Sequence, residues 1–259
     1  MDRSARRRSA RYRAIFRRHP GLRLLRATII AAIITIYHPK SHADVIVTKF
    51  LKGGSTDDGF LPPEVEVVSM YIDHVLENDI GVALAAEHDV PIYPSIRRAL
   101  HAGQNKLNVD AVLLIGEHGD YAWNEKEQHL FPRQYFMEQI CGVMSTSGRA
   151  VPVFNDKHLS WKWEWAKEMV DTSRQMGFAL MAGSSVPVTS RLPPIDLPRG
   201  AEVEQAMCVG TGGPDSYDIH CLEGVQALVE RRKGGGALAT DRSATPLAVS
   251  RAGPARRQA

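Results

Sequence analysis

The sequence contains little cysteine and no apolar run long enough to cross a bilayer, and each shortage excludes a class of protein. Its three cysteines, Cys141, Cys208 and Cys221, form no CxxC pair. An odd and widely spaced set of thiols argues against a disulfide framework and favours a reducing compartment. The apolar run 27–37 is too short for a membrane span, and its β-branched residues are typical of a buried strand.

Positive charge is also scarce outside the two ends of the chain. The formal net charge is +3, yet residues 1–26 contain ten arginines and one acid. The middle of the chain is mildly acidic, so the overall charge does not indicate a nucleic-acid surface. We expect a small-molecule substrate, no specific nucleic acid and no membrane span, with a homo-oligomer possible. The expected location is the cytoplasm. The alternative is export through a twin-arginine-like N-terminal signal, because arginines precede the apolar run.

Short apolar strands alternate with helices through most of the chain. The expected strands lie at 27–37, 65–71, 90–93, 110–115, 151–154 and 178–181. The expected helices lie at 42–51, 80–88, 96–101, 132–144 and 159–176. This alternation is typical of βαβ units with right-handed crossovers. It predicts an α/β fold with a Rossmann-like, doubly wound parallel sheet.

The chain is expected to divide into four segments. These are a disordered basic arm at 1–25, a Rossmann-like α/β domain at 26–190, the start of an incomplete C-terminal α+β domain at 191–232 and a disordered tail at 233–259. The third segment has one expected strand at 202–209 and one expected helix at 217–232. Because this remnant has no sheet to complete it, we expect a C-terminally truncated or frameshifted chain.

Polar side chains follow several of the expected strands. In a doubly wound fold, ligands bind outside the carboxyl ends of the strands. The residues that fall at these ends are His38, Ser41, His42, Glu117, His118, Asp120, Tyr121, Asp156, Lys157 and His158. Lys157 is the sharpest catalytic candidate, because a partly desolvated lysine can polarise a substrate oxygen or move a proton. Asp156 would tune its charge or cap the next helix.

Two other interpretations of the same residues stay open. Histidines with carboxylates suit zinc or non-haem iron, so Glu117, His118, His158 and His220 are candidate ligands of a metal-dependent hydrolase, lyase or isomerase. There is no HExxH motif, and the spacing imposes no ligand geometry. His220 is equally well explained as a packed histidine of an amphipathic helix. The other interpretation is a non-enzymatic, Rossmann-like binding protein.

The order of motifs resembles the Gfo/Idh/MocA oxidoreductase family. The segment "LNVDAVLLIGEHGDY" is similar to the family's fourth strand, which ends over the nicotinamide. "GRAVPVFNDKHLS" is similar to the next strand, whose end carries a Glu-Lys-Pro motif; Asp156, Lys157 and His158 occupy these places. "GGPDSYDIHCLE" is similar to the segment with the family's catalytic histidine, which falls on His220. The resemblance covers about residues 27–232.

This resemblance implies NAD(P)-dependent oxidation or reduction of a sugar-like or cyclitol hydroxyl. Lys157 would hold the reacting oxygen and His220 would act as acid and base, with Asp156 and His158 as the other catalytic candidates. Hydride would pass between the nicotinamide and the substrate carbon. The implied cofactor is NAD or NADP. The residues expected to bind it are Tyr37, Ser41, His42, Asp73, Gly116, Glu117 and His118.

Two departures from the family's pattern concern the cofactor and the motif. No glycine occurs between Gly21 and Gly53, so the Gly-rich turn that normally follows the first strand is missing. Ser41, Lys40 and the first N–H groups of the following helix still provide an anion site. His158 replaces the family's proline, so the cis peptide bond that this proline often supports is not expected.

Overall fold

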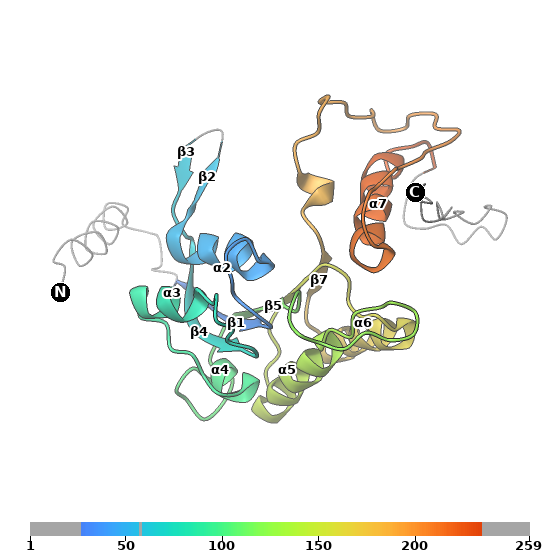
Figure 1. Cartoon of the computed structure of the whole chain (residues 1–259). Coiled ribbons are helices and arrows are strands. Elements are labelled where there is room, and N and C mark those ends of the chain that lie inside the picture. Colours follow the sequence, from blue (N-terminus) through green and yellow to red (C-terminus); the bar gives the residue numbers. More distant parts are fainter. Residues whose placement is uncertain (1–26, 57–58, 235–259) are drawn as a thin grey trace, which may run out of the picture.

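The structure is a computed structural model that describes residues 27–56 and 59–234 (Figure 1). Its strands are β1 (Thr28–Ile34), β2 (Gly54–Thr56), β3 (Gly59–Leu61), β4 (Val65–Ile72), β5 (Ala111–Ile115), β6 (Val153–Asp156) and β7 (Leu180–Gly183). Its helices are α2 (His42–Lys52), α3 (Gly81–Glu87), α4 (Ile96–His101), α5 (Arg133–Ser147), α6 (Trp163–Met176), the 3-10 turn η1 (Val186–Val188) and α7 (Pro214–Val229). The arm expected at 1–25 and the tail expected at 233–259, apart from residues 233 and 234, lie outside the described ranges.

Five strands form one parallel sheet in the order β4-β1-β5-β6-β7. β1 pairs with β4 on one side and with β5 on the other, so the chain changes its direction of progress across the sheet at β1. β5, β6 and β7 then follow one another outward in sequence order. This is a doubly wound order, and the expected Rossmann-like fold class is confirmed.

Alternate residues of β1 face two separate helical layers. Ile30, Ala32 and Ile34 pack with α2 and α3, whereas Ala31 and Ile33 pack with α4, α5 and α6. Figure 1 shows α2 on one side of the sheet and α4 and α5 on the other. β1 is therefore buried on both faces, which explains why its sequence is a continuous apolar run rather than an alternating one.

The strand expected at 90–93 is wrong as a full strand. Ile92 makes one isolated parallel bridge with Met70, beside β4. The N–H of Met70 donates to Pro91 O at 3.0 Å, and the N–H of Tyr93 donates to Met70 O at 2.8 Å. The segment thus lies where a sixth strand would extend the sheet. Prolines at 91 and 94 supply no N–H groups, so the pairing does not continue.

Two further expectations differ from the structure. The expected loop "STDDGFLPPE" contains a short antiparallel hairpin, in which β2 pairs with β3. The strand expected at 202–209 is wrong: these residues are irregular, and the pairing recorded beside them is a single bridge between Ala201 and Arg232. A ladder needs a partner strand for its N–H and C=O groups, and the described part of the chain supplies none here.

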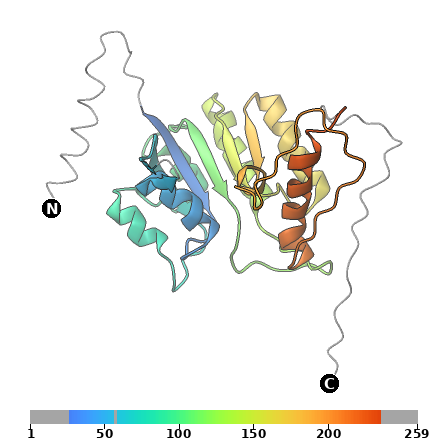
Figure 2. The same cartoon turned by 90° about the horizontal axis from the view of Figure 1, so that it is seen from above.

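α7 lies beside the β7 end of the sheet in both views (Figures 1 and 2). The N–H of Ser184, just after β7, donates to Glu223 Oε1 at 2.9 Å and ties the helix to the sheet. This contact brings a helix from the C-terminal part of the chain next to the strand ends. None of the helices within the described ranges combines the length and apolar character that a bilayer span requires.

Candidate functional site

The carboxyl ends of β1, β5 and β6 lie side by side at one edge of the sheet, because these parallel strands are neighbours. Glu117 and His118 follow β5, and Asp156 and Lys157 lie at the end of β6. His42 begins α2, the helix that follows β1. Residues that are up to 115 positions apart in the chain, from His42 to Lys157, are therefore brought to one edge.

A buried network of charges lies at the centre of this edge. Glu117 accepts hydrogen bonds from Arg133 of α5 through Oε1 and from Lys157 Nζ through Oε2, the latter at 3.3 Å. Arg133 is 0% exposed, Glu117 6% and Lys157 7%. Buried charges are tolerated when each is paired and hydrogen-bonded, as here. Burial is the main cause that lowers the pKa of Lys157.

His158 contacts the same arginine. Arg133 Nη1 donates to His158 Nε2 at 3.0 Å, so Nε2 carries no proton and the neutral ring carries its proton on Nδ1. Burial, followed by the charge of Arg133, lowers the pKa of His158 to about 3. At neutral pH this imidazole is an uncharged acceptor within the network.

Asp156 connects the network to the α2 side of the edge. His42 Nδ1 donates to Asp156 Oδ2 at 2.5 Å. The ring centroid of His118 lies 5.1 Å from that of His42 and 5.9 Å from that of His38. Burial, followed by the neighbouring His42, lowers the pKa of His118 to about 4. The β1–β5 side of the site is thus lined by imidazoles, with an aspartate fixing the orientation of one of them.

Three non-glycine residues in the turns at this edge have left-handed backbone conformations. The φ angle is 65° at Lys40, 63° at His118 and 61° at Lys157. Such a conformation favours glycine and costs other residues about 1–2 kcal/mol. At Lys157 the turn is held by its own N–H, which donates to Gly183 O at 2.9 Å. Backbone strain of this kind is concentrated at functional sites in many proteins.

The first turn of α2 is the part of the edge that could hold a phosphate group. Ser41 caps the helix, and its Oγ accepts a hydrogen bond from Asp44 N at 3.2 Å. Among the hydrogen bonds of the described residues, none engages the backbone N–H groups of His42 and Ala43. Free N–H groups at a helix start favour anions. The start of α2 could therefore hold an anion without a glycine-rich turn.

Tyr37 and Gly116, both expected at the cofactor, make their contacts within the protein interior. Tyr37 is 1% exposed, and its hydroxyl is hydrogen-bonded to Thr48 Oγ1 at 2.8 Å. A Cβ added to Gly81 would lie 2.6 Å from the Tyr37 ring. A Cβ added to Gly116 would lie 2.6 Å from Arg133 Cγ. Gly116 thus provides room for the buried arginine, and the Tyr37 side chain belongs to the core.

Asp73 lies after β4, one strand further along the same edge. Its Oδ1 accepts from the hydroxyl of Tyr71, and its Oδ2 accepts from the hydroxyl of Tyr121 at 2.7 Å. The ring of His74 stacks on Tyr121 with centroids 4.9 Å apart. A fixed carboxylate in this region is the group with which dinucleotide-binding folds hold a ribose hydroxyl.

His220 reaches the edge from α7. The hydroxyl of Ser184 donates to Glu223, and His220 Nδ1 lies 3.2 Å from Ser184 Oγ. His220 is therefore the donor in this second contact, and its Nε2 is left as a proton acceptor. Burial, followed by the charge of Lys157, lowers the pKa of His220. The charge of Lys157 therefore favours the neutral form of the His220 ring.

A cavity of about 390 Å³ lies between His158 and α7. Its walls come from the loop 126–128, the segment 158–161 and the start of α7, including Asp215 and Asp218. Carboxylates beside apolar surface suit a small ligand that carries several hydroxyl groups. The cavity is also lined by Ile219 and Leu222 of α7, which lie on either side of His220 in the sequence.

A candidate metal-binding group overlaps this site. One ligand atom from each of His42, Glu117 and His118 lies within 4.8 Å of the others. Two of the ligands suggested by the sequence, Glu117 and His118, are thus brought together. His158 and His220 belong to no such group within the described ranges.

The charges around Glu117 do not fit a divalent cation well. Both carboxylate oxygens already accept hydrogen bonds from cationic side chains, those of Arg133 and Lys157. A metal ion at Glu117 would be repelled by these two buried positive charges, and repulsion is strong where water is excluded. The geometry therefore favours an ion-pair network over a metal centre.

Sequence reasoning misses three residues that organise the site. Arg133 is predicted only as the start of a helix, because nothing in the spacing shows that it will meet Glu117. Ser184 lies in a polar segment after the last strand, where loops are commonly polar. Glu223 lies three positions after His220 on a helix, and this spacing brings side chains together. The sequence could therefore have predicted that Glu223 lies near His220.

Among the comparisons with known proteins, only the one with solved structures gives matches, and these are distant. No family model matches the chain, and no curated protein matches it significantly. A Gfo/Idh/MocA family oxidoreductase from Vibrio cholerae is 17% identical, with a TM-score of 0.40. UDP-N-acetylglucosamine 3-dehydrogenase GnnA from Acidithiobacillus ferrooxidans is 12% identical, with a TM-score of 0.46. GenD2 from gentamicin A biosynthesis, solved in complex with NAD, is 16% identical, with a TM-score of 0.37.

The matches cover much of this chain but a smaller part of each solved structure. They include 62%, 80% and 64% of this chain for the Vibrio cholerae protein, GnnA and GenD2. They span 40%, 57% and 36% of the respective solved chains. One of these solved structures, the Vibrio cholerae protein, is a member of the family that the motifs resemble.

Proposed function

We propose that this edge of the sheet is the active site of a nicotinamide-dependent oxidoreductase, acting on a hydroxyl or carbonyl of a sugar-like or cyclitol substrate. The observation that carries the proposal is that Lys157 and His220, from two separate elements, contact neighbouring residues at the end of β7, namely Gly183 and Ser184. Lys157 is buried and held by Glu117, and His220 is held through Ser184. Each is fixed by one neighbour and keeps further hydrogen-bonding capacity for a substrate.

The two side chains have complementary roles in the proposed reaction. Lys157 Nζ donates a hydrogen bond to the reacting oxygen and stabilises the negative charge that develops there. His220 Nε2 accepts the hydroxyl proton during oxidation and returns it during reduction. Its lowered pKa keeps the ring neutral, and therefore ready to accept a proton, at neutral pH. Glu117 and Arg133 act as positioning residues for Lys157.

The proposed cofactor is NAD or NADP, which supplies the hydride chemistry when bound. The N–H groups of His42 and Ala43 would hold a phosphate, and Asp73 would accept a hydrogen bond from a ribose hydroxyl. The fit is supported by the free N–H groups at the start of α2. The cavity beside His158 would hold the substrate, with Asp215 and Asp218 accepting from its hydroxyl groups.

A cofactor titration tests this function while the substrate is still unidentified. NADH and NADPH are added to the full chain, and energy transfer from tryptophan to the reduced nicotinamide is followed. We expect saturable binding of at least one of them, weakened at least fivefold in Asp73→Ala. Lys157→Met should bind the cofactor as the wild type does. Lack of saturation at millimolar concentrations of both cofactors would contradict the proposal.

A second stage separates binding from chemistry. Candidate cyclitols and sugars are screened for reduction of the nicotinamide by the wild type. Turnover of any active substrate should fall by about 10²–10⁴-fold in Lys157→Met. Lys167→Met is the matched control, because Lys167 lies on the exposed face of α6 with 62% of its side chain accessible. Equal turnover in both variants would remove Lys157 from the reaction.

A further inference from the structure

Two of the three cysteines meet beside α7, although 13 positions separate them in the sequence. Cys208 lies in the irregular segment that precedes α7, and Cys221 lies on α7 next to His220. Burial, followed by the neighbouring Cys208 side chain, raises the pKa of the Cys221 thiol. Both are free thiols, Cys208 exposed and Cys221 partly exposed, whereas Cys141 is buried in α5. The structure therefore separates one buried thiol from an accessible pair.

The backbone is closely packed around this pair. A Cβ added to Gly210 would lie 2.2 Å from Cys221 Sγ, and a Cβ added to Gly224 would lie 3.7 Å from Cys208 Sγ. Each sulfur therefore lies against a glycine that is close in sequence to the other cysteine. The lack of a side chain at Gly210 lets the irregular segment approach Cys221 more closely than any other residue there would allow.

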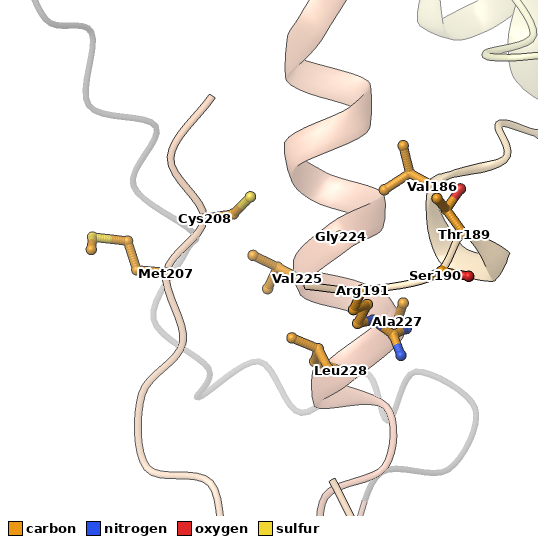
Figure 3. Close-up of a pocket in the computed structure, with 10 residues that line it drawn as sticks. All are labelled: Val186, Thr189, Ser190, Arg191, Met207, Cys208, Gly224, Val225, Ala227 and Leu228. Atoms are coloured by element: carbon orange, nitrogen blue, oxygen red, sulfur yellow. The ribbon is translucent and has the colours of Figure 1, made fainter. Parts of the chain in front are cut away.

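The surroundings leave the pair open to small reagents. Figure 3 shows the Cys208 side chain directed toward α7, with the Met207 side chain turned the other way. Both residues border an open cavity of about 340 Å³ that Val225 and Leu228 of α7 also line. A small disulfide can reach Cys208 from solvent, because this residue is exposed. Cys221 lies on α7, the helix toward which the Cys208 side chain is directed.

We propose that Cys208 and Cys221 form a reversible disulfide that fastens the segment 201–213 to α7. The Cys208 thiolate attacks one sulfur of a small disulfide, for which oxidised glutathione is the probe, and one glutathione thiolate leaves. Cys221 then gives its proton to solvent and attacks Cys208 Sγ, releasing the second glutathione thiolate. Two protein thiols are oxidised, and the two electrons reduce one glutathione disulfide to two thiols.

The bond would act on the helix that carries His220. Cys221 is the next residue after His220, and Glu223 on the same helix is hydrogen-bonded to Ser184. Fixing α7 to the segment 201–213 would therefore change the freedom of the acid–base residue. This consequence rests on the proposed function, whereas formation of the disulfide itself does not.

Thiol mapping of the full chain tests the proposal. The protein is equilibrated with mixtures of reduced and oxidised glutathione, the reaction is stopped with acid, and free thiols are alkylated after unfolding. We expect loss of two of the three thiols per chain, recovery of a peptide linking Cys208 to Cys221, and full reversal by reduced glutathione. Cys141 should stay alkylatable, because burial raises the pKa of its thiol to about 11.

Matched variants complete the test. Cys141→Ser should form the linked peptide as the wild type does, and Cys208→Ser should form none. The proposal is overturned if the wild type accumulates a stable glutathione adduct on Cys208 with no linked peptide. It is also overturned if the main product is a disulfide between chains or one that includes Cys141. If Cys208→Ser does not fold, the wild-type peptide map alone decides the matter.

Discussion

Replacing Arg133 by methionine should destabilise the fold more than any surface change. The guanidinium is 0% exposed, pairs with Glu117, donates to His158 at 3.0 Å and lies 4.9 Å from the centre of the Phe131 ring. Removing it leaves the Glu117 carboxylate in the interior with Lys157 as its remaining partner. Breaking a buried ion pair costs about 3–5 kcal/mol, because an uncompensated charge stays behind. Since Lys157 remains, we expect a loss of about 3 kcal/mol in the free energy of unfolding.

Urea denaturation, followed by tryptophan fluorescence, measures this loss. With a slope of about 2 kcal/mol per molar urea, the midpoint of Arg133→Met should fall by about 1.5 M. The matched control is Arg149→Met. Its guanidinium is 45% exposed and pairs with Asp110 at the surface at 2.9 Å. An exposed pair contributes about 0–1 kcal/mol, so the control should shift the midpoint by less than about 0.5 M.

A double variant identifies the cause of the loss. Arg133→Met with Glu117→Gln removes both opposite charges, so it should be less destabilised than the sum of the single changes by about 1–3 kcal/mol. The reasoning is refuted if Arg133→Met loses no more stability than Arg149→Met. It is also refuted if the two single losses add without any coupling, because the pair would then carry no interaction energy.

The other predictions concern pH and backbone. In Lys157→Met the pKa of His220 should rise, because a neighbouring positive charge is removed, and the limb of a plot of kcat/KM against pH that reports His220 would move to higher pH. His158 has a pKa of about 3 when folded against 6.5 ordinarily, so the stability it contributes is present above pH 6.5 and is lost as the pH falls toward 3. His158→Gln should therefore lose less stability between pH 6.5 and 4 than the wild type, as chemical denaturation at each pH would show; equal slopes would contradict this. Lys40→Gly should raise the midpoint of thermal unfolding by several degrees, because the left-handed turn at Lys40 suits glycine; an unchanged or lower midpoint would contradict it.

The sheet could be predicted from the sequence because its strands are buried on both faces. β1 and β5 are short, continuous apolar runs, and most of their residues are buried. Ser41 and Ser95 also mark helix starts correctly, since each accepts a hydrogen bond from the N–H three residues on. The strand expectation fails at 90–93 because the prolines at 91 and 94 supply no N–H groups, and at 202–209 because the described part of the chain supplies no partner strand.

The candidate site could be predicted only in part. The rule that ligands bind at strand ends is enough, with the sequence alone, to place Glu117 and Lys157 at one edge. It does not reveal that the buried Arg133 pairs with Glu117, because the approach of α5 to β5 depends on tertiary packing. Tertiary packing also explains why the sequence does not predict that Cys208 and Cys221 come close together. Their approach depends on how an irregular segment passes α7.

The left-handed turns at Lys40, His118 and Lys157 differ in what their side chains contribute to the candidate site. Glycine would relax the backbone at all three positions, but its effect on the surrounding contacts differs among them. At Lys40, whose side chain is exposed, that change removes nothing that touches the charge network. At Lys157 it would remove the amine that pairs with the buried Glu117, and at His118 it would remove the imidazole that lies beside His42. A stabilised version of this chain should therefore place glycine at Lys40 and keep His118 and Lys157.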